Sequence, residues 1–308
     1  MSSPLPRKGV LAALWLPTDS SGNLLRAELA RHLIFLKSCG INGVLALGST
    51  GEFPQFDLDQ RKRALATIAE LAAPLPVIAN ISDIRPHSGA DLGRLARELG
   101  LTAIAIMTPG FFPSTQEDAL AHFFHASEKS GLPALLYNFP ELTGTRIALD
   151  TVRRFAERAP MLGIKQSGGE FAYHKELIAL GKNKGFSVFS GADTRLPEVF
   201  ALGADGCIGG LVNIAPELMV HLYRVCREGA AGDTSPAFEQ LKQIGTIIDR
   251  LTFPLNVAAG IEARGFAVGE PKAIVSPRSR EIYAGIVDEL RAKFADWKLP
   301  VPGGSSMA

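Results

Sequence analysis

Short apolar segments rich in β-branched residues recur along the first two-thirds of the chain, and glycine or proline bounds each of them. Most are apolar at both odd and even positions, which is typical of parallel strands covered on both faces of a sheet. Segments with helical periodicity lie between them, for example at 24–38, 57–71, 90–99 and 115–130. The predicted strands are 9–16, 43–47, 76–81, 102–107, 133–138, 162–165, 186–190 and 205–208.

Eight βα units in succession close most simply into a (β/α)8 TIM barrel, an α/β fold, and an open doubly wound sheet is the alternative. After the eighth strand only helical segments follow. We therefore expect a barrel core through strand 8 over residues 1–214, and the last barrel helix with a C-terminal helical extension over residues 215–298. Residues 299–308, which contain a Pro-Gly-Gly-Ser-Ser run, are expected to form a disordered tail.

Charge and cysteine content indicate which kinds of ligand and which cellular compartment to expect. The chain has 32 Lys and Arg against 31 Asp and Glu, so no global field favours nucleic acid or an anionic membrane, and we expect a small-molecule partner. Cys39, Cys207 and Cys226 lack C-x-x-C spacing and nearby histidines, so neither a disulfide framework nor a metal site is predicted. Without a leader-like segment or an apolar run of about 20 residues, we expect a cytoplasmic protein that does not span a membrane.

Three predicted strands end in polar residues, and in a barrel the carboxyl ends of the strands form the active-site mouth. The polar segments are Gly-Ser-Thr-Gly-Glu at 48–52, Tyr-Asn-Phe-Pro at 137–140 and Lys-Gln-Ser-Gly-Gly at 165–169. A desolvated amine at Lys165 would be a nucleophile that forms a Schiff base with a ketone or aldehyde. The alternative is a lysine that extends from the strand end into solvent.

The neighbours of Lys165 decide between these interpretations. Tyr137 belongs to the adjacent strand, where its phenol could transfer protons, although a core tyrosine is the simpler alternative. Ser49 and Thr50 offer two hydroxyls on a glycine-flanked turn, an arrangement suited to a carboxylate. Glu52 is expected to cap a helix or bond the local backbone rather than to enter the chemistry.

Together these segments resemble a known family. Motifs at 48–52, 137–140, 163–169 and 203–209 stand in the order and spacing of the dihydrodipicolinate synthase/N-acetylneuraminate lyase family, and the resemblance covers residues 7–295. It implies pyruvate-dependent class I aldolase chemistry on a usually homotetrameric barrel, with a covalent imine and no cofactor or metal. By this resemblance Lys165 is the Schiff-base lysine, Tyr137 the acid/base group, Ser49 a relay hydroxyl and Thr50 the group that holds the pyruvyl carboxylate.

At two places the sequence departs from the family pattern, and these differences indicate which activity within the family the chain has. Leu142 stands where the synthases that make dihydrodipicolinate carry an arginine for the second substrate's carboxylate, which disfavours that activity. Phe111 and Phe112 replace a tyrosine pair that in many relatives reaches into the neighbouring subunit's site. Phenylalanine transfers no proton, so a relay would run through Ser49, water or substrate oxygens.

The segment 51–55 and the Tyr-Asn-Phe-Pro motif are most similar to the aldolases that cleave 2-keto-3-deoxy sugar acids to pyruvate and an aldehyde. The alternatives are N-acetylneuraminate lyase, a sugar-acid dehydratase that uses the same enamine, dihydrodipicolinate synthase, and a binding protein without turnover. For Asp193 two interpretations stay open, hydroxyl binding and helix capping, of which we favour capping. The further residues expected to contact substrate are Ser167, Asp193, Thr194, Ile208 and Asn213.

Apolar side chains also exceed what one core-facing helical stripe requires. Phe111, Phe112, Phe123 and Phe124 are examples. Because symmetric self-association is the usual way to bury such surface, we expect a homo-oligomer, either a dimer or a tetramer.

Overall fold

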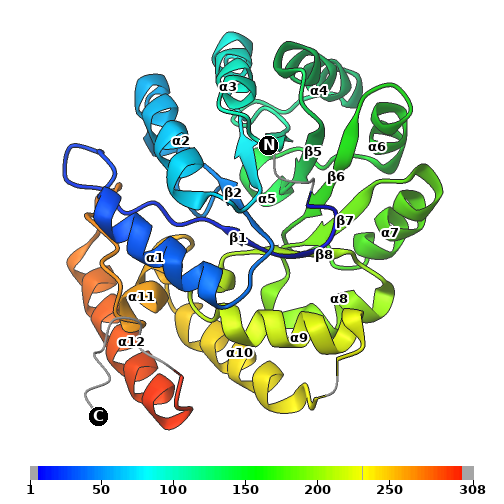
Figure 1. Ribbon diagram of the computed structural model, residues 1–308. Helices are drawn as coiled ribbons and strands as arrows, with labels where there is room; N and C mark the ends of the chain where they lie inside the picture. Colours follow the sequence, from blue (N-terminus) through cyan, green and yellow to red (C-terminus); the bar gives the residue numbers. More distant parts are fainter. Residues whose placement is uncertain (1–5, 231, 300–308) are drawn as a thin grey trace.

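Eight parallel strands form a closed barrel in the computed structural model, which describes residues 6–230 and 232–299 (Figure 1). The strands pair in chain order, and β1 closes the ring by pairing with β8. The (β/α)8 prediction is therefore confirmed and the open-sheet alternative is wrong. The strands are β1 (Gly9–Ala13), β2 (Gly43–Ala46), β3 (Val77–Asn80), β4 (Ala103–Met107), β5 (Ala134–Asn138), β6 (Met161–Gln166), β7 (Ser187–Ser190) and β8 (Gly206–Gly209).

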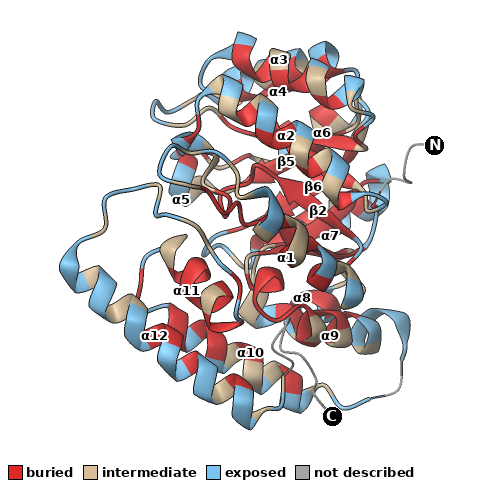
Figure 2. Ribbon diagram, turned by 60° about the vertical axis from the view of Figure 1, so that its left-hand side comes forward, coloured by how far each residue is buried: buried red, intermediate tan, exposed pale blue. Residues whose placement is uncertain are grey.

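Helices surround the barrel, and their outward faces carry the exposed residues while the strands are buried (Figure 2). Helix α3 begins at Pro86 rather than at residue 90, because proline suits the first turn of a helix and Gly89 packs closely against the backbone of Ile81. The helices are α1 (Arg26–Ser38), α2 (Leu58–Ala72), α3 (Pro86–Glu98), α4 (Gln116–Ser130), α5 (Pro140–Thr143), α6 (Leu149–Ala156), α7 (Tyr173–Lys184), α8 (Leu196–Leu202), α9 (Pro216–Glu228), α10 (Ser235–Ile248), α11 (Leu255–Ala263) and α12 (Pro277–Asp296).

The strand register sets the height of the side chains in the barrel. In the β5–β6 pair, Tyr137 lies beside Lys165, and Lys165 in turn lies beside Phe189 of β7. A compact cluster of apolar side chains, including Leu45, Ile78 and Leu135, packs with Tyr137 and fills the interior, so the barrel is a packed core and not a pore. The register therefore brings the predicted amine and phenol together at one end of the barrel.

Helices α10, α11 and α12 form the C-terminal extension, which packs beside the barrel near α1 (Figure 1). A fully buried arginine, Arg264, joins it to α9 through an ion pair with Glu217, at 2.8 Å. Trp15, just after β1, donates its indole N–H to the carbonyl of Val268, at 3.0 Å. The extension is thus attached to the barrel at the end where the strands terminate. The tail predicted at 299–308 lies, apart from Leu299, outside the described residues.

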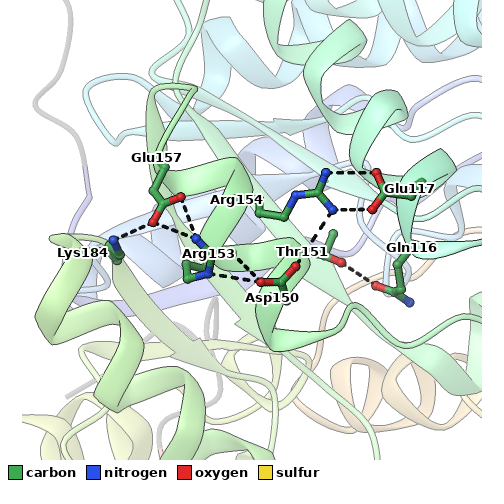
Figure 3. Close-up of polar contacts among 8 residues, drawn as sticks. All are labelled: Gln116, Glu117, Asp150, Thr151, Arg153, Arg154, Glu157 and Lys184. Carbon is green, nitrogen blue, oxygen red and sulfur yellow. Dashed lines mark hydrogen bonds and ion pairs between the residues drawn. The ribbon is translucent and has the colours of Figure 1, made fainter.

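On the outer ring, charged side chains link α4, α6 and α7 (Figure 3). Arg154 pairs with Glu117, Arg153 pairs with Asp150 at 2.6 Å, and Glu157 bridges Arg153 and Lys184. These groups are solvent-exposed, so the pairs add little stability next to the apolar contacts beneath them. Within the described residues, no helix is long and apolar enough to cross a membrane.

Candidate active site

Lys165 is buried at the carboxyl end of β6, with 4% of its surface exposed. Its Nζ donates a hydrogen bond to the Tyr137 hydroxyl at 3.0 Å and lies 4.1 Å from the centre of the same ring. Among the described residues, the carboxyl of Asp193 interacts electrostatically with this amine but forms no ion pair with it. Lys165 therefore does not extend into solvent, and its amine is hydrogen-bonded to a phenol.

The Tyr137 hydroxyl also contacts the loop that follows β2. It lies 3.2 Å from the Ser49 hydroxyl, and either oxygen can donate. Both side chains are buried, as is Thr50. Lys165, Tyr137 and Ser49 thus form a continuous chain of polar groups, built from three predicted strand ends. Such a chain provides a path for a proton between the amine and the loop.

A cavity of about 310 Å³ is lined by Lys165 and Tyr137. Gly191, after β7, leaves space there, because a Cβ atom at that position would lie 2.3 Å from the Ser167 hydroxyl oxygen and 3.4 Å from Cε of Lys165. Besides Lys165 and Tyr137, the predicted residues in the cavity wall are Thr50, Ser167, Asp193, Thr194 and Ile208. The C-terminal extension also contributes polar and aromatic residues that the sequence does not predict there, among them Asp249, Phe253 and Asn256.

Asp193 does not cap a helix, so the interpretation we favoured is wrong. Its Oδ2 accepts from the backbone N–H of Leu211 at 2.8 Å, across the gap between β7 and β8. Its Oδ1 is buried and has no hydrogen-bond partner in the described part of the chain. Burial raises the pKa of this carboxyl to about 6. Asp193 thus brings an acceptor with unused capacity to the cavity wall.

Two other predicted contacts lie elsewhere. Asn213 is fully buried below the cavity, where its Nδ2 donates to the carbonyls of Ala13 and Gly210 and its Oδ1 accepts from the backbone of Trp15. This amide serves the backbone and is not in the cavity wall. Leu142 is half exposed in a neighbouring cleft of about 640 Å³, which it lines together with Ser49 and other residues. Leu142 does not line the amine cavity itself, and Phe253 lines both the cleft and that cavity.

Glu52 is also placed differently from the prediction. Its carboxylate makes no cap and instead pairs with Lys272 of the C-terminal extension at 2.8 Å. No local sequence pattern links these residues, because 220 positions separate them. The contact could only be found once the extension was placed against the barrel.

The fold and this site together define a barrel enzyme with a buried amine at its mouth, and the comparisons with known proteins agree. The profile of the dihydrodipicolinate synthetase family matches residues 6–293. The chain belongs to this family of pyruvate-dependent class I aldolases, and it is a carbon–carbon lyase of that class. The predicted family resemblance is thereby confirmed.

Individual relatives share the whole fold at modest identity. A 4-hydroxy-tetrahydrodipicolinate synthase of Pseudomonas aeruginosa is 31% identical over 262 residues, covering 84% of this chain and 85% of the relative. The crystal structure of a chloride-inhibited dihydrodipicolinate synthase from Acinetobacter baumannii, complexed with pyruvate, has a TM-score of 0.83 at 25% identity, with coverage of 92% of this chain and 99% of that one. A prophage protein of the same family from E. coli K12 reaches a TM-score of 0.85 at 24% identity, with coverage of 95% and 99%.

The raised pKa of Asp193 predicts a pH-dependent stability. Because the pKa is about 6 in the folded state and 3.8 ordinarily, the protonated group contributes stability below about pH 4 that is lost as the pH rises through about 6. Asp193→Asn keeps an acceptor for Leu211 but does not ionise. Its free energy of unfolding, minus that of the wild type, should therefore rise by about 2 kcal/mol between about pH 4 and pH 7 in urea titrations. A difference that stays constant with pH would contradict the assignment.

Proposed function

We propose that the protein reversibly cleaves a 2-keto-3-deoxy sugar acid to pyruvate and an aldehyde, through an imine on Lys165. The observation that carries the proposal is the buried chain of Lys165, Tyr137 and Ser49 beside a cavity. An amine held out of water next to a phenol, with no ion-paired carboxylate, suits nucleophilic attack on a carbonyl carbon.

The reaction follows from these positions. The amine of Lys165 adds to the C2 carbonyl to give a carbinolamine, and Tyr137 donates its phenolic proton to the carbinolamine hydroxyl, so that water leaves and a protonated imine forms. The Tyr137 phenolate then takes the proton of the C4 hydroxyl while the C3–C4 bond breaks, the aldehyde leaves, and the bonding electrons move to the iminium to give an enamine. Protonation of the enamine at C3 and hydrolysis of the imine release pyruvate and restore the amine. The imine is the electron sink, so the scheme requires no cofactor and no metal.

Ser49 and Thr50 take the supporting roles in this scheme. Ser49 contacts the Tyr137 hydroxyl and also lines the neighbouring cleft, so it can pass a proton out of the cavity. Thr50 lies in the cavity wall on the same glycine-flanked loop, where its hydroxyl can donate to the carboxylate of the bound pyruvyl group.

The charge of the cavity supports an uncharged, hydroxylated substrate tail. Lys165 is the only cationic residue among the described residues that line it, and Asp193 and Asp249 add two carboxyl groups. An aldehyde that carries its own carboxylate would face these groups without an arginine or second lysine to bind it. Substrate hydroxyls, in contrast, can donate to the free oxygen of Asp193.

Product analysis separates the alternatives. Release of pyruvate from a sugar acid supports cleavage, whereas a 2-oxo acid that keeps its carbon count and lacks one hydroxyl would indicate the dehydratase. Release of an acylated amino sugar would indicate N-acetylneuraminate lyase. Condensation of pyruvate with aspartate semialdehyde would indicate dihydrodipicolinate synthesis. Binding without any product would indicate the binding protein.

Borohydride trapping tests the imine. Reduction in the presence of pyruvate should attach one pyruvyl group to the peptide that contains Lys165, since only an imine is reduced to a stable secondary amine. Mass spectrometry of the digested protein locates the adduct. Lys165→Ala should remain folded and give no adduct, and the exposed Lys182→Ala should be trapped like the wild type. An adduct on another lysine, or none in the wild type, would refute the mechanism.

Tyr137→Phe separates imine formation from bond cleavage. Tyr137 is needed most to accept the C4 hydroxyl proton when the C3–C4 bond breaks, so we expect cleavage to slow by about 10² to 10⁴-fold while pyruvate is still trapped on the protein. The two readouts are pyruvate release in the steady state and the extent of trapping. An unchanged rate of cleavage would show that another group accepts the proton.

We also propose that the protein assembles as a homo-oligomer, a dimer or a tetramer. Ile84, Phe111, Phe112 and Leu142 are exposed large apolar residues, and Ile84, Phe111 and Leu142 line the same cleft. Light scattering after size exclusion should give a multiple of the 32.9 kDa chain mass, and Phe112→Asp should lower it because a buried charge opposes association. A monomer in the wild type would contradict the proposal.

A further inference from the structure

The loop that carries Ser49 and Thr50 is strained at both of its ends. Leu47 has a φ of 55° and Glu52 a φ of 56°, so two residues with side chains adopt the left-handed region. This conformation is unfavourable for a residue with a side chain and persists only where its surroundings hold it. The positions of the two hydroxyls thus depend on what holds residues 47 and 52.

At the first end, the barrel itself holds the loop. Asn80 of β3 is fully buried, and its Nδ2 donates to the carbonyl of Leu47 at 2.6 Å. Its Oδ1 accepts from the hydroxyl of Ser82, also at 2.6 Å, which fixes the orientation of the amide. Leu47 is therefore held by the neighbouring strand.

At the second end, the contact comes from the C-terminal extension. Lys272 donates from Nζ to Oε2 of Glu52 at 2.8 Å, and the exposed fractions of the two side chains are 5% and 13%. The ammonium also lies 4.4 Å from the ring centre of Trp15. Burial lowers the pKa of Lys272, and the charge of Glu52 opposes that shift. Removing either partner would leave a buried charge unpaired, which is costly.

The backbone near Lys272 is itself fixed to the barrel. The N–H of Glu270 donates to the carbonyl of Thr18 at 2.7 Å. Gly269 has a φ of 80° and approaches Thr18 so closely that a Cβ atom would lie 2.3 Å from that carbonyl oxygen. The backbone just before Lys272 is therefore held in place, and the ion pair with Lys272 restrains Glu52.

We propose that Lys272 is a positioning residue, which holds the loop at 47–52 through Glu52 so that Thr50 faces the cavity of Lys165 and Ser49 contacts the Tyr137 hydroxyl. The inference rests on the proposed function for the roles of Ser49 and Thr50. Lys272 touches neither the cavity nor the reacting atoms, and it acts on pyruvate binding only through the loop.

The test is Lys272→Met, which keeps the length of the side chain and removes its charge. We expect the pyruvate concentration for half-maximal borohydride trapping to rise about tenfold, because the loop relaxes and Thr50 shifts from the carboxylate. In the absence of ligand, hydrogen exchange of the peptide over 47–52 should be faster in Lys272→Met than in the wild type. Glu52→Gln, which can still accept from Lys272, should show both effects more weakly.

Glu217→Gln is the matched control, since Glu217 also pairs with a buried cation in the C-terminal region, Arg264, but does not contact the loop. It should lower the melting temperature and leave half-maximal trapping and exchange at 47–52 unchanged. The inference would be overturned if Lys272→Met had the same hydrogen exchange at 47–52 and the same half-maximal pyruvate concentration as the wild type. It would also be overturned if Glu217→Gln changed both quantities as much as Lys272→Met does. If Lys272→Met does not fold, the same two measurements on Glu52→Gln test the inference, and wild-type values in that variant would overturn it. Absence of trapping in the wild type would refute the proposed function alone, because exchange still tests the loop.

Discussion

The pairing of β5 with β6 places a buried amine beside a phenol, and the rest of the site is arranged around that pair. Tyr137 and Lys165 are register partners, so their proximity follows from the backbone of the barrel and not from a flexible loop. An amine buried in this way, with no ion-paired carboxylate, contributes little to stability. Under the proposed function, the same amine attacks a carbonyl group.

The C-terminal extension completes the wall of the cavity at the end of the barrel. It contributes Asp249, Phe253 and Asn256 to the cavity wall and holds Glu52 through Lys272. The barrel thus supplies the reactive groups, while the extension determines the outer surface of the cavity and supports the loop that carries Thr50. This division agrees with the general observation that barrel enzymes keep the chemistry on strand ends and vary the elements around them.

The sequence predicts the elements whose signals are local. Eight apolar segments indicate the barrel, and polar strand ends locate Lys165 and Tyr137, because adjacent parallel strands bring their ends together. It does not predict contacts between distant segments. The partners of Glu52 and Asp193 come from other parts of the chain, and Asn213 bonds to backbone atoms that no side-chain pattern reveals. The start of α3 was placed too late because Pro86 and Gly89 also occur in loops.

The central claim is that Lys165 converts bound pyruvate to an enamine, and deuterium exchange of pyruvate tests it most directly. In D₂O the enamine takes up deuterium at C3, so the methyl signal of pyruvate in proton NMR should decay in the presence of the wild-type protein without any aldehyde. With Lys165→Ala the signal should decay no faster than in buffer. Equal decay rates for the wild type and Lys165→Ala would contradict the account.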